Sequence, residues 1–151
     1  MKLNIEVNNL TDSPIVDDFF VRVAEKTIAE SGYDFLQEKN IAISIALVSE
    51  QEMQKLNRES RKKDSVTDIL SFFEYGSIAD MEQAVENDKL EEIFLGELIL
   101  CYDDIMRYAH DENISLEKEL INVFSHGVLH LLCFSHGEKM FSLQKKIINE
   151  I

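Results

Sequence analysis

The segment from Ser115 to Cys133 constrains the fold more than any other part of the chain, because it has the pattern of a long helix that is apolar nearly all round. A helix of this kind has no face suited to water, so it must lie inside the fold with other elements packed around it. Its apolar residues are Leu116, Leu120, Ile121, Val123, Phe124, Val128, Leu129, Leu131 and Leu132. Any polar side chain on such a helix needs a partner.

Two histidines interrupt this apolar helix, and a third follows it. His126 and His130 are four residues apart, so on a helix they project from one face, one turn apart. His136 comes six residues later, where the helix is expected to have ended. Three protein ligands with an open fourth position are typical of a catalytic zinc site, where the metal activates water. We predict that these histidines bind one divalent transition metal ion, with Zn²⁺ the first choice, although imidazole also suits other metals. The isolated His110 is interpreted as a non-ligand.

The rest of the chain predicts a small sheet with covering helices. Strands are expected at residues 3–8, 41–48, 67–75 and 94–101. Helices are expected from Ser13-Pro14 to Gly32, from the Ser49/Glu52 capping box to about Ser60, and over 102–110, 115–133 and 138–151. The acidic segment 76–92 is interpreted as a solvated loop or an exposed short helix. This order predicts one α+β domain, residues 1–151, with a small mixed sheet of about four strands covered by helices.

Composition limits the classes of function. A formal net charge of −14 disfavours non-specific wrapping of nucleic acid, because affinity for phosphate normally comes from Lys and Arg. A local basic patch, or a partner protein that supplies the affinity, is compatible with this charge. Cys101 and Cys133 form no CxxC pair, so neither a disulfide framework nor a four-cysteine zinc site is expected. No apolar run has the length of a membrane helix, and the N-terminal MKLNIEVNN lacks the apolar stretch of a signal peptide. We expect a cytoplasmic protein with no membrane contact.

The histidine spacing also matches the zinc-protease pattern HExxHxxGxxH, in which the Glu is the general base. Here Gly127 occupies the Glu position and Cys133 the Gly position. A protease mechanism would therefore need another carboxylate, and Glu97, Asp68 and Asp103 are candidates by residue type. Gly127 itself suggests a close approach of substrate or of a neighbouring strand beside the metal.

Three ordered motifs resemble the YbeY family of metal-dependent endoribonucleases and ribosomal RNA maturation factors. The family signature HGxLHLxGYDH corresponds to residues 126–136, which read HGVLHLLCFSH. The pattern LNxxYRxxDxPTDVLSFP corresponds to residues 56–73, which read LNRESRKKDSVTDILSFF, and LGDIxIC corresponds to residues 95–101, LGELILC. The chain departs from the family at Cys133, where a Gly would supply a turn with positive φ, and at Ser135, where an Asp would supply a carboxylate.

The resemblance implies a single-strand-specific endoribonuclease, a hydrolase of phosphodiester bonds, that acts in ribosomal RNA processing. It implies that the metal lies at the floor of a cleft and that Arg61 contacts phosphate as a catalytic and substrate-binding residue. Ser71 is predicted to line the cleft with Phe72, although the strand pattern favours Phe72 and Phe73 as partly or wholly core residues. Expected partners are single-stranded RNA, in particular ribosomal RNA, and a ribosomal or ribosome-associated protein.

Two alternatives from other classes stay open at this stage. One is a metallohydrolase with a substrate other than RNA, such as a peptide or a small phosphoester. The other is a non-catalytic ribosome-associated adaptor that keeps the metal for stability, which the negative charge and the altered residues 133–135 favour. Arg58, Arg61 and Lys62 would share one helix face, and in the simplest interpretation they are solvated cations near a helix C-terminus.

Overall fold

The computed structural model describes residues 2–87 and 90–151. Within these residues the strands are β1 (Lys2–Asn9), β2 (Asn40–Leu47), β3 (Ile69–Phe73) and β4 (Glu92–Leu100). The helices are α1 (Asp17–Glu30), α2 (Glu50–Arg61), α3 (Ile78–Asn87), α4 (Tyr102–Asp111), α5 (Leu116–Leu131) and α6 (Glu138–Glu150), with a 3-10 turn at Asp34–Leu36.

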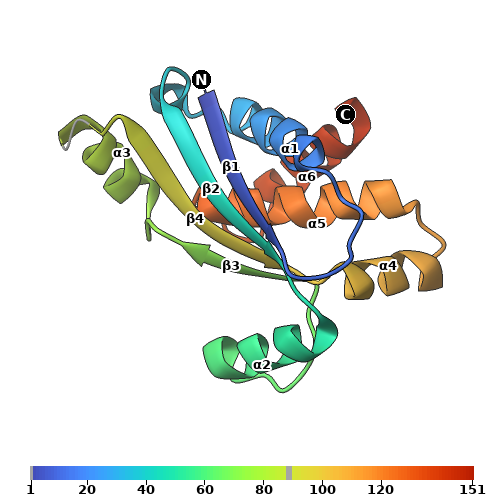
Figure 1. The fold of residues 1–151 in the computed structure, drawn as a ribbon. Helices are drawn as coiled ribbons and strands as arrows, with labels where there is room; N and C mark the ends of the chain where they lie inside the picture. The colour runs from blue at the N-terminus through green and yellow to red at the C-terminus, as the bar shows by residue number, and fades with distance from the viewer. Residues whose placement is uncertain (1, 88–89) are drawn as a thin grey trace.

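The strands form one mixed sheet in the order β1-β2-β4-β3. β1 is parallel to β2 and β2 is parallel to β4, whereas β3 runs antiparallel to β4 and forms an edge. Helices α1, α5 and α6 gather on one side of the sheet, while α2 stands apart at one end of it (Figure 1). The predicted α+β fold with a small mixed sheet covered by helices is confirmed.

Helix α5 lies in the centre of the main core, as its apolar pattern predicts. Phe124 is fully buried, and its ring meets the ring of Phe20 from α1 at a centroid distance of 4.9 Å with edge-to-face geometry. Each large side chain buried in this way contributes roughly 1.5–3 kcal/mol to folding. The Ser115 hydroxyl accepts a hydrogen bond from the backbone N–H of Lys118 and so begins the helix. The apolar side chains of α5 thus anchor it in the core, and its functional side chains project from a buried helix.

Helix α2, at one end of the sheet, contacts the face opposite α5 through a small apolar cluster. Its Met53 packs with Leu70 of β3 and Ile99 of β4 in a second, smaller core cluster. The Ser49 hydroxyl accepts from the N–H of Glu52 at 3.2 Å, so the helix start predicted from the capping box is confirmed. The helix ends with Arg61, next to the edge strand β3 that follows it in the chain.

The predicted start of the first helix is wrong. Helix α1 begins at Asp17, with Val16 as an N-cap that makes no side-chain hydrogen bond. Ser13 instead belongs to a polar turn, where its hydroxyl shares a 2.6 Å hydrogen bond with the hydroxyl of Thr11. The path that the chain takes from β1 to α1 therefore overrides the local preference of Ser13 for the N-cap position. The predicted end holds, because Gly32 follows the C-cap with a φ of 79°.

The prediction for the acidic segment 76–92 is confirmed only in part. It contains helix α3, as one of the two alternatives stated, but Met81 and Val85 are buried in the main core. One face of the helix is therefore structural rather than solvated. Residues 88–89 of this segment lie outside the described residues.

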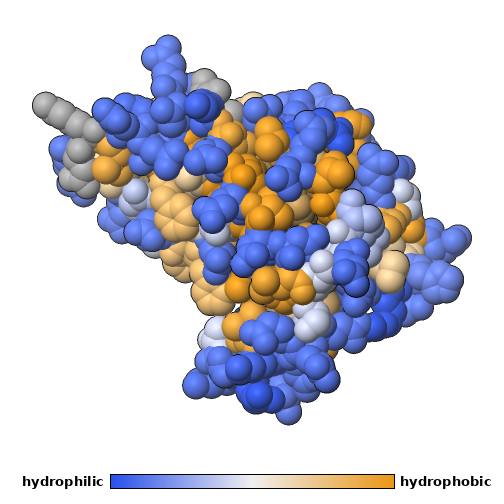
Figure 2. Space-filling view, in the orientation of Figure 1, coloured by the Kyte–Doolittle hydropathy of each residue, from blue (hydrophilic) through white to orange (hydrophobic). Residues whose placement is uncertain are grey.

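Apolar and hydrophilic residues are segregated on the face of the molecule shown in Figure 2. In the view of Figure 2, apolar residues gather across the middle of the face and hydrophilic residues surround them. Among the residues that the structure describes, no helix combines the length and the apolar character needed to span a bilayer.

Candidate metal centre and active-site cavity

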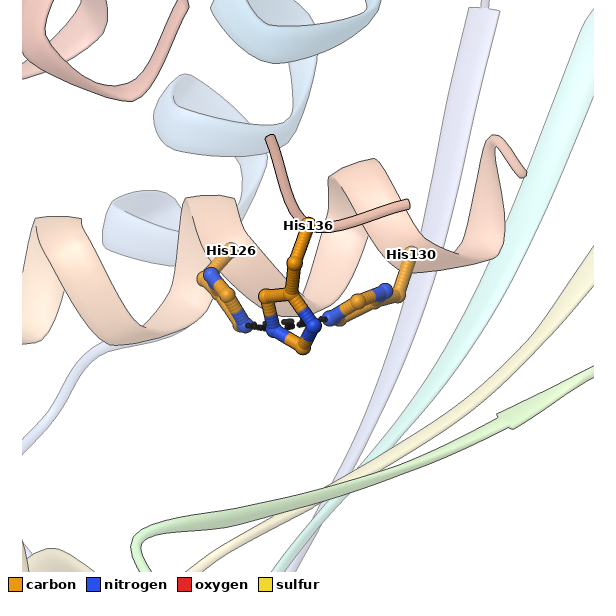
Figure 3. A group of neighbouring side chains, drawn as sticks. All are labelled: His126, His130 and His136. Atoms are coloured by element: carbon orange, nitrogen blue, oxygen red, sulfur yellow. Dashed lines mark hydrogen bonds between the residues drawn. The ribbon is translucent and has the colours of Figure 1, made fainter. Parts of the chain in front are cut away.

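His126 and His130 project from α5 toward His136, which lies in the turn before α6 (Figure 3). The Nε2 atoms of the three rings are close to one another. The distance is 3.0 Å between His126 and His130, 3.3 Å between His130 and His136, and 3.1 Å between His136 and His126. The three predicted ligands are thus brought together with one nitrogen of each ring directed at a common point.

This spacing fits a tetrahedral metal ion. Zinc binds histidine at about 2.0–2.1 Å, so two ligand nitrogens of a tetrahedral site lie roughly 3.3–3.4 Å apart. The measured nitrogen separations of 3.0–3.3 Å are close to that value. Three nitrogen lone pairs at this distance would repel one another unless a cation lies between them. The group can therefore hold a divalent ion and leave one coordination position open.

The second nitrogen of two of these rings has its own partner. Nδ1 of His126 lies 3.2 Å from Oε1 of Gln144, and Nδ1 of His130 lies 3.2 Å from the carbonyl oxygen of Phe134. Both partners are acceptors, so each Nδ1 carries the proton and donates it. Each Nε2 then keeps a lone pair for the metal, which is the usual way that outer residues orient ligating histidines.

Burial lowers the pKa of the His130 imidazole, and the electrostatic effect of the neighbouring His126 and His136 lowers it further. A lowered pKa favours the neutral imidazole, which is the form that coordinates a metal.

The turn that follows α5 has the left-handed backbone geometry expected of a glycine, although the residue at that position is Cys133. Cys133 has a φ of 68°, and the N–H groups of Cys133 and Phe134 donate to the carbonyls of His130 and Leu129 in a Schellman pattern. The hydroxyl of Tyr33 braces this turn by donating to the carbonyl of Leu132 at 3.0 Å. The missing Gly therefore does not displace His136 from the other ligands. The Cys133 thiol donates to the carbonyl of Tyr75, and it is not among the three grouped ligands.

Gly127 lies where α5 crosses the sheet. A Cβ at this position would lie 2.5 Å from Cδ1 of Ile69 and 3.0 Å from Cδ2 of Leu98. Of the two explanations offered by the sequence, the structure favours a neighbouring strand rather than a substrate.

The histidines open onto a large cavity. It has a volume of about 840 Å³, and its walls come from the end of α2, from β3, from α5 and from α6. Arg61 and Ser71, both singled out from the sequence, line this cavity together with His126 and His130. Asp68, which immediately precedes β3, also lines it. The other two carboxylates considered as bases do not. Glu97 accepts a hydrogen bond from Ser44 on the opposite face of the sheet, and Asp103 is exposed on α4.

The interpretation of Phe72 and Phe73 as core residues is wrong. Their exposed fractions are 40% and 58%, and both line the cavity, because β3 is an edge strand. Two residues of α6, not predicted from the sequence, also belong to the site. Phe141 is 54% exposed and lies in the cavity wall, and Gln144 holds His126. Gln144 had a signal, since it stands in the apolar stripe with Met140 and Ile147, where a polar residue needs a partner.

The basic cluster at the end of α2 does not act as one face. Arg58 pairs with Asp64 at 3.2 Å, and Lys62 has left the helix with a φ of 60°. Of the described residues that line the cavity, Arg61 is the one with a permanently positive side chain.

An α+β fold that presents a potential metal centre at a cavity is the arrangement of a metal-dependent hydrolase. The model of the family Endoribonuclease YbeY matches residues 6–151. The chain is similar to Endoribonuclease YbeY of Finegoldia magna, with 31% identity over 97% of this chain and 93% of the relative. It is also similar to that of Halalkalibacterium halodurans, with 30% identity over 97% and 95% of the two chains.

The chain therefore belongs to the Endoribonuclease YbeY family, and the family and the enzyme class predicted from the sequence are confirmed. The fold agrees with the solution structure of TM1509 from Thermotoga maritima, with a TM-score of 0.59 and 24% identity over 97% of this chain and 87% of that one.

Proposed function

We propose that residues 1–151 form a single catalytic domain, a single-strand-specific and metal-dependent endoribonuclease that acts in ribosomal RNA processing in the cytoplasm. The observation that carries this proposal is the convergence of three histidine nitrogens, 3.0–3.3 Å apart, beside a cavity that Arg61 also lines. The ion would be held by His126, His130 and His136, with Zn²⁺ the first choice. When bound, such an ion supplies an activated water and polarises the scissile phosphate.

The remaining steps fall to side chains of the cavity. Arg61 has a planar guanidinium group that matches phosphate oxygens in pairs, so it would hold the phosphate and stabilise the added negative charge. The Ser71 hydroxyl on β3 would donate to a phosphate or sugar oxygen. Asp68 is the carboxylate of the cavity that is suited to accept a proton from the attacking hydroxyl or water.

The aromatic walls of the cavity support a preference for single strands. Phe73 on β3 and Phe141 on α6 present exposed rings to the same cavity, which His126 and His130 also line. Bases stack on such rings only when they are free of a partner strand. A duplex would have to open before it could use these walls.

The negative charge of the chain supports a need for help in binding. A formal net charge of −14 opposes the approach of RNA, and in the cavity only the proposed ion and Arg61 offset it. We propose that a ribosomal or ribosome-associated protein brings this enzyme to its RNA.

Replacement of Arg61 by Ala tests the proposed role of the cavity. We expect cleavage of a labelled single-stranded RNA to fall by a factor of roughly 10²–10³, because one fixed positive donor is lost at the developing charge. Arg58→Ala is the matched control, since Arg58 is on the same helix but pairs with Asp64. Equal rates for both variants would contradict a role of Arg61 in catalysis.

Replacement of Phe141 by Ala tests the source of strand preference. Stacking of one base on an aromatic ring is worth about 1–3 kcal/mol, so the KM for single-stranded RNA should rise by roughly 5- to 150-fold. The rate on a duplex of the same sequence should change little, and the ratio of the two rates should therefore fall. Tyr108→Ala provides the control, because Tyr108 is similarly exposed on α4 outside the cavity. An unchanged ratio would show that Phe141 does not contribute to the preference.

A further inference from the structure

A chain of hydrogen bonds leads from the metal centre to a buried carboxylate. Nδ1 of His126 meets Oε1 of Gln144 at 3.2 Å, and Nε2 of Gln144 meets Oδ1 of Asn122 at 3.0 Å. Nδ2 of Asn122 in turn meets Oε1 of Glu119 at 3.0 Å. Glu119, Asn122 and His126 are on α5 at intervals of three and four residues, so they lie along one face of the helix. Gln144 bridges to them from α6.

The Glu119 carboxylate fixes which group donates and which accepts in each hydrogen bond of this series. A carboxylate accepts hydrogen bonds and cannot donate them, so Asn122 must turn its NH₂ group toward Glu119. The oxygen of Asn122 is then left to accept from the NH₂ group of Gln144. Gln144 consequently offers its oxygen to His126, and an oxygen can only accept. The proton of the His126 ring is thereby placed on Nδ1, and Nε2 keeps the lone pair that faces His130 and His136.

The surroundings of Glu119 indicate that it is not there for stability. The residue is only 5% exposed, and within residues 2–87 and 90–151 no Lys or Arg forms an ion pair with it. It borders a small cavity of about 310 Å³ that Asp68 and Asp104 also line, so the charged groups that share this cavity with it have the same sign. A carboxylate in such a place is unfavourable for folding unless it is hydrogen-bonded. Among the described residues, the side-chain hydrogen-bond partner of Glu119 is Asn122, the next member of the hydrogen-bond chain.

We propose that Glu119 is a positioning residue that acts through Asn122 and Gln144 to fix the tautomer of His126 and so prepares the metal centre. This inference rests on the proposed metal site but not on the nature of the substrate. Outer residues of this kind commonly change metal affinity by a factor of 10–100.

The test is the nearly isosteric substitution Glu119→Gln, with Glu117→Gln as the control, because Glu117 is exposed on the same helix. A glutamine at 119 can donate as well as accept, so the amides of Asn122 and Gln144 can reverse. NMR of the ¹⁵N-labelled, metal-free protein at pH 8 reports the tautomer of each histidine. We expect the Nδ1–H form of His126 in wild type and in Glu117→Gln, and a mixture of tautomers in Glu119→Gln. Zinc affinity, measured by competition with a chromophoric chelator, should fall 10- to 100-fold in Glu119→Gln alone.

The double variant Glu119→Gln/Gln144→Glu provides the rescue. Its carboxylate at 144 accepts hydrogen bonds both from Nδ1–H of His126 and from the NH₂ group of Asn122. The oxygen of Asn122 then accepts from the new amide at 119, so every hydrogen bond of the series is restored with the donors and acceptors between 119 and 144 reversed. We expect the Nδ1–H form and most of the zinc affinity to return, which a loss of packing alone would not allow.

Several outcomes would overturn the proposal. They are an Nε2–H form of His126 in the metal-free wild type, an unchanged affinity in Glu119→Gln, and an equal loss in Glu117→Gln. The first needs no variant, so it decides even if Glu119→Gln fails to fold. Zinc binding without RNA cleavage would contradict the proposed function and not this role of Glu119.

Discussion

Replacing His126 by Ala is expected to abolish both zinc binding and RNA cleavage. The three Nε2 atoms lie within 3.3 Å of one another, and removal of one leaves only two nitrogen atoms to bind the proposed ion. Without the ion there is no activated water, and the expected fall in rate is at least about 10³-fold. The measurement compares wild type and variant, purified in the same way, on a labelled single-stranded RNA with and without a chelator.

The control for this experiment is His110→Ala. His110 is an exposed histidine of α4 and is not part of the three-histidine group, so its loss should change neither zinc binding nor rate. Removal of metal by the chelator should reduce wild type and His110→Ala to the level of His126→Ala. Equal cleavage by wild type and His126→Ala would indicate a contaminating nuclease. Zinc binding without cleavage would instead favour a non-catalytic adaptor.

The grouping of the three histidines could be predicted from the sequence because its geometry is local. His126 and His130 share a helix face through a spacing of four residues, and that spacing holds wherever the helix lies in the fold. The place of His136, the third member of the group, needed only the expectation that the chain turns after the helix. The tertiary structure then adds what spacing cannot give, namely the Nε2 distances of 3.0–3.3 Å.

The walls of the cavity could not be predicted in this way, because they depend on how distant elements meet. Phe141 and Gln144 reach the site only because α6 packs back against α5. Phe72 and Phe73 have a strand pattern that suits a buried strand equally well. They are exposed because β3 is the edge strand, which is a fact of strand order rather than of periodicity. The prediction of where α1 starts was wrong for a related reason, since the path of residues 10–16 overrides the capping preference of Ser13.

Replacing Gly96 by Ala is expected to cause the largest loss of stability among single glycine changes in this chain. Gly96 has a φ of 140°, and a Cβ there would lie 2.2 Å from the carbonyl oxygen of Phe72 and 2.9 Å from Cδ2 of Leu131. The first obstacle is backbone, so it cannot move without separating β3 from β4. We expect the free energy of unfolding to fall by about 3–5 kcal/mol, measured by urea denaturation of the metal-free protein.

Gly76→Ala is the matched control, because nothing lies within 4 Å of a Cβ at that position. Its free energy of unfolding should stay within about 0.5 kcal/mol of wild type. The comparison bears on function as well as on folding, since β3 carries Ser71 and Phe73 into the cavity and is paired only with β4 in the described sheet. A strand pushed away from Gly96 would move that wall away from the histidines. If Gly96→Ala were as stable as Gly76→Ala, β3 could not lie as close to β4 as described, and the placement of Ser71 in the cavity wall would be wrong.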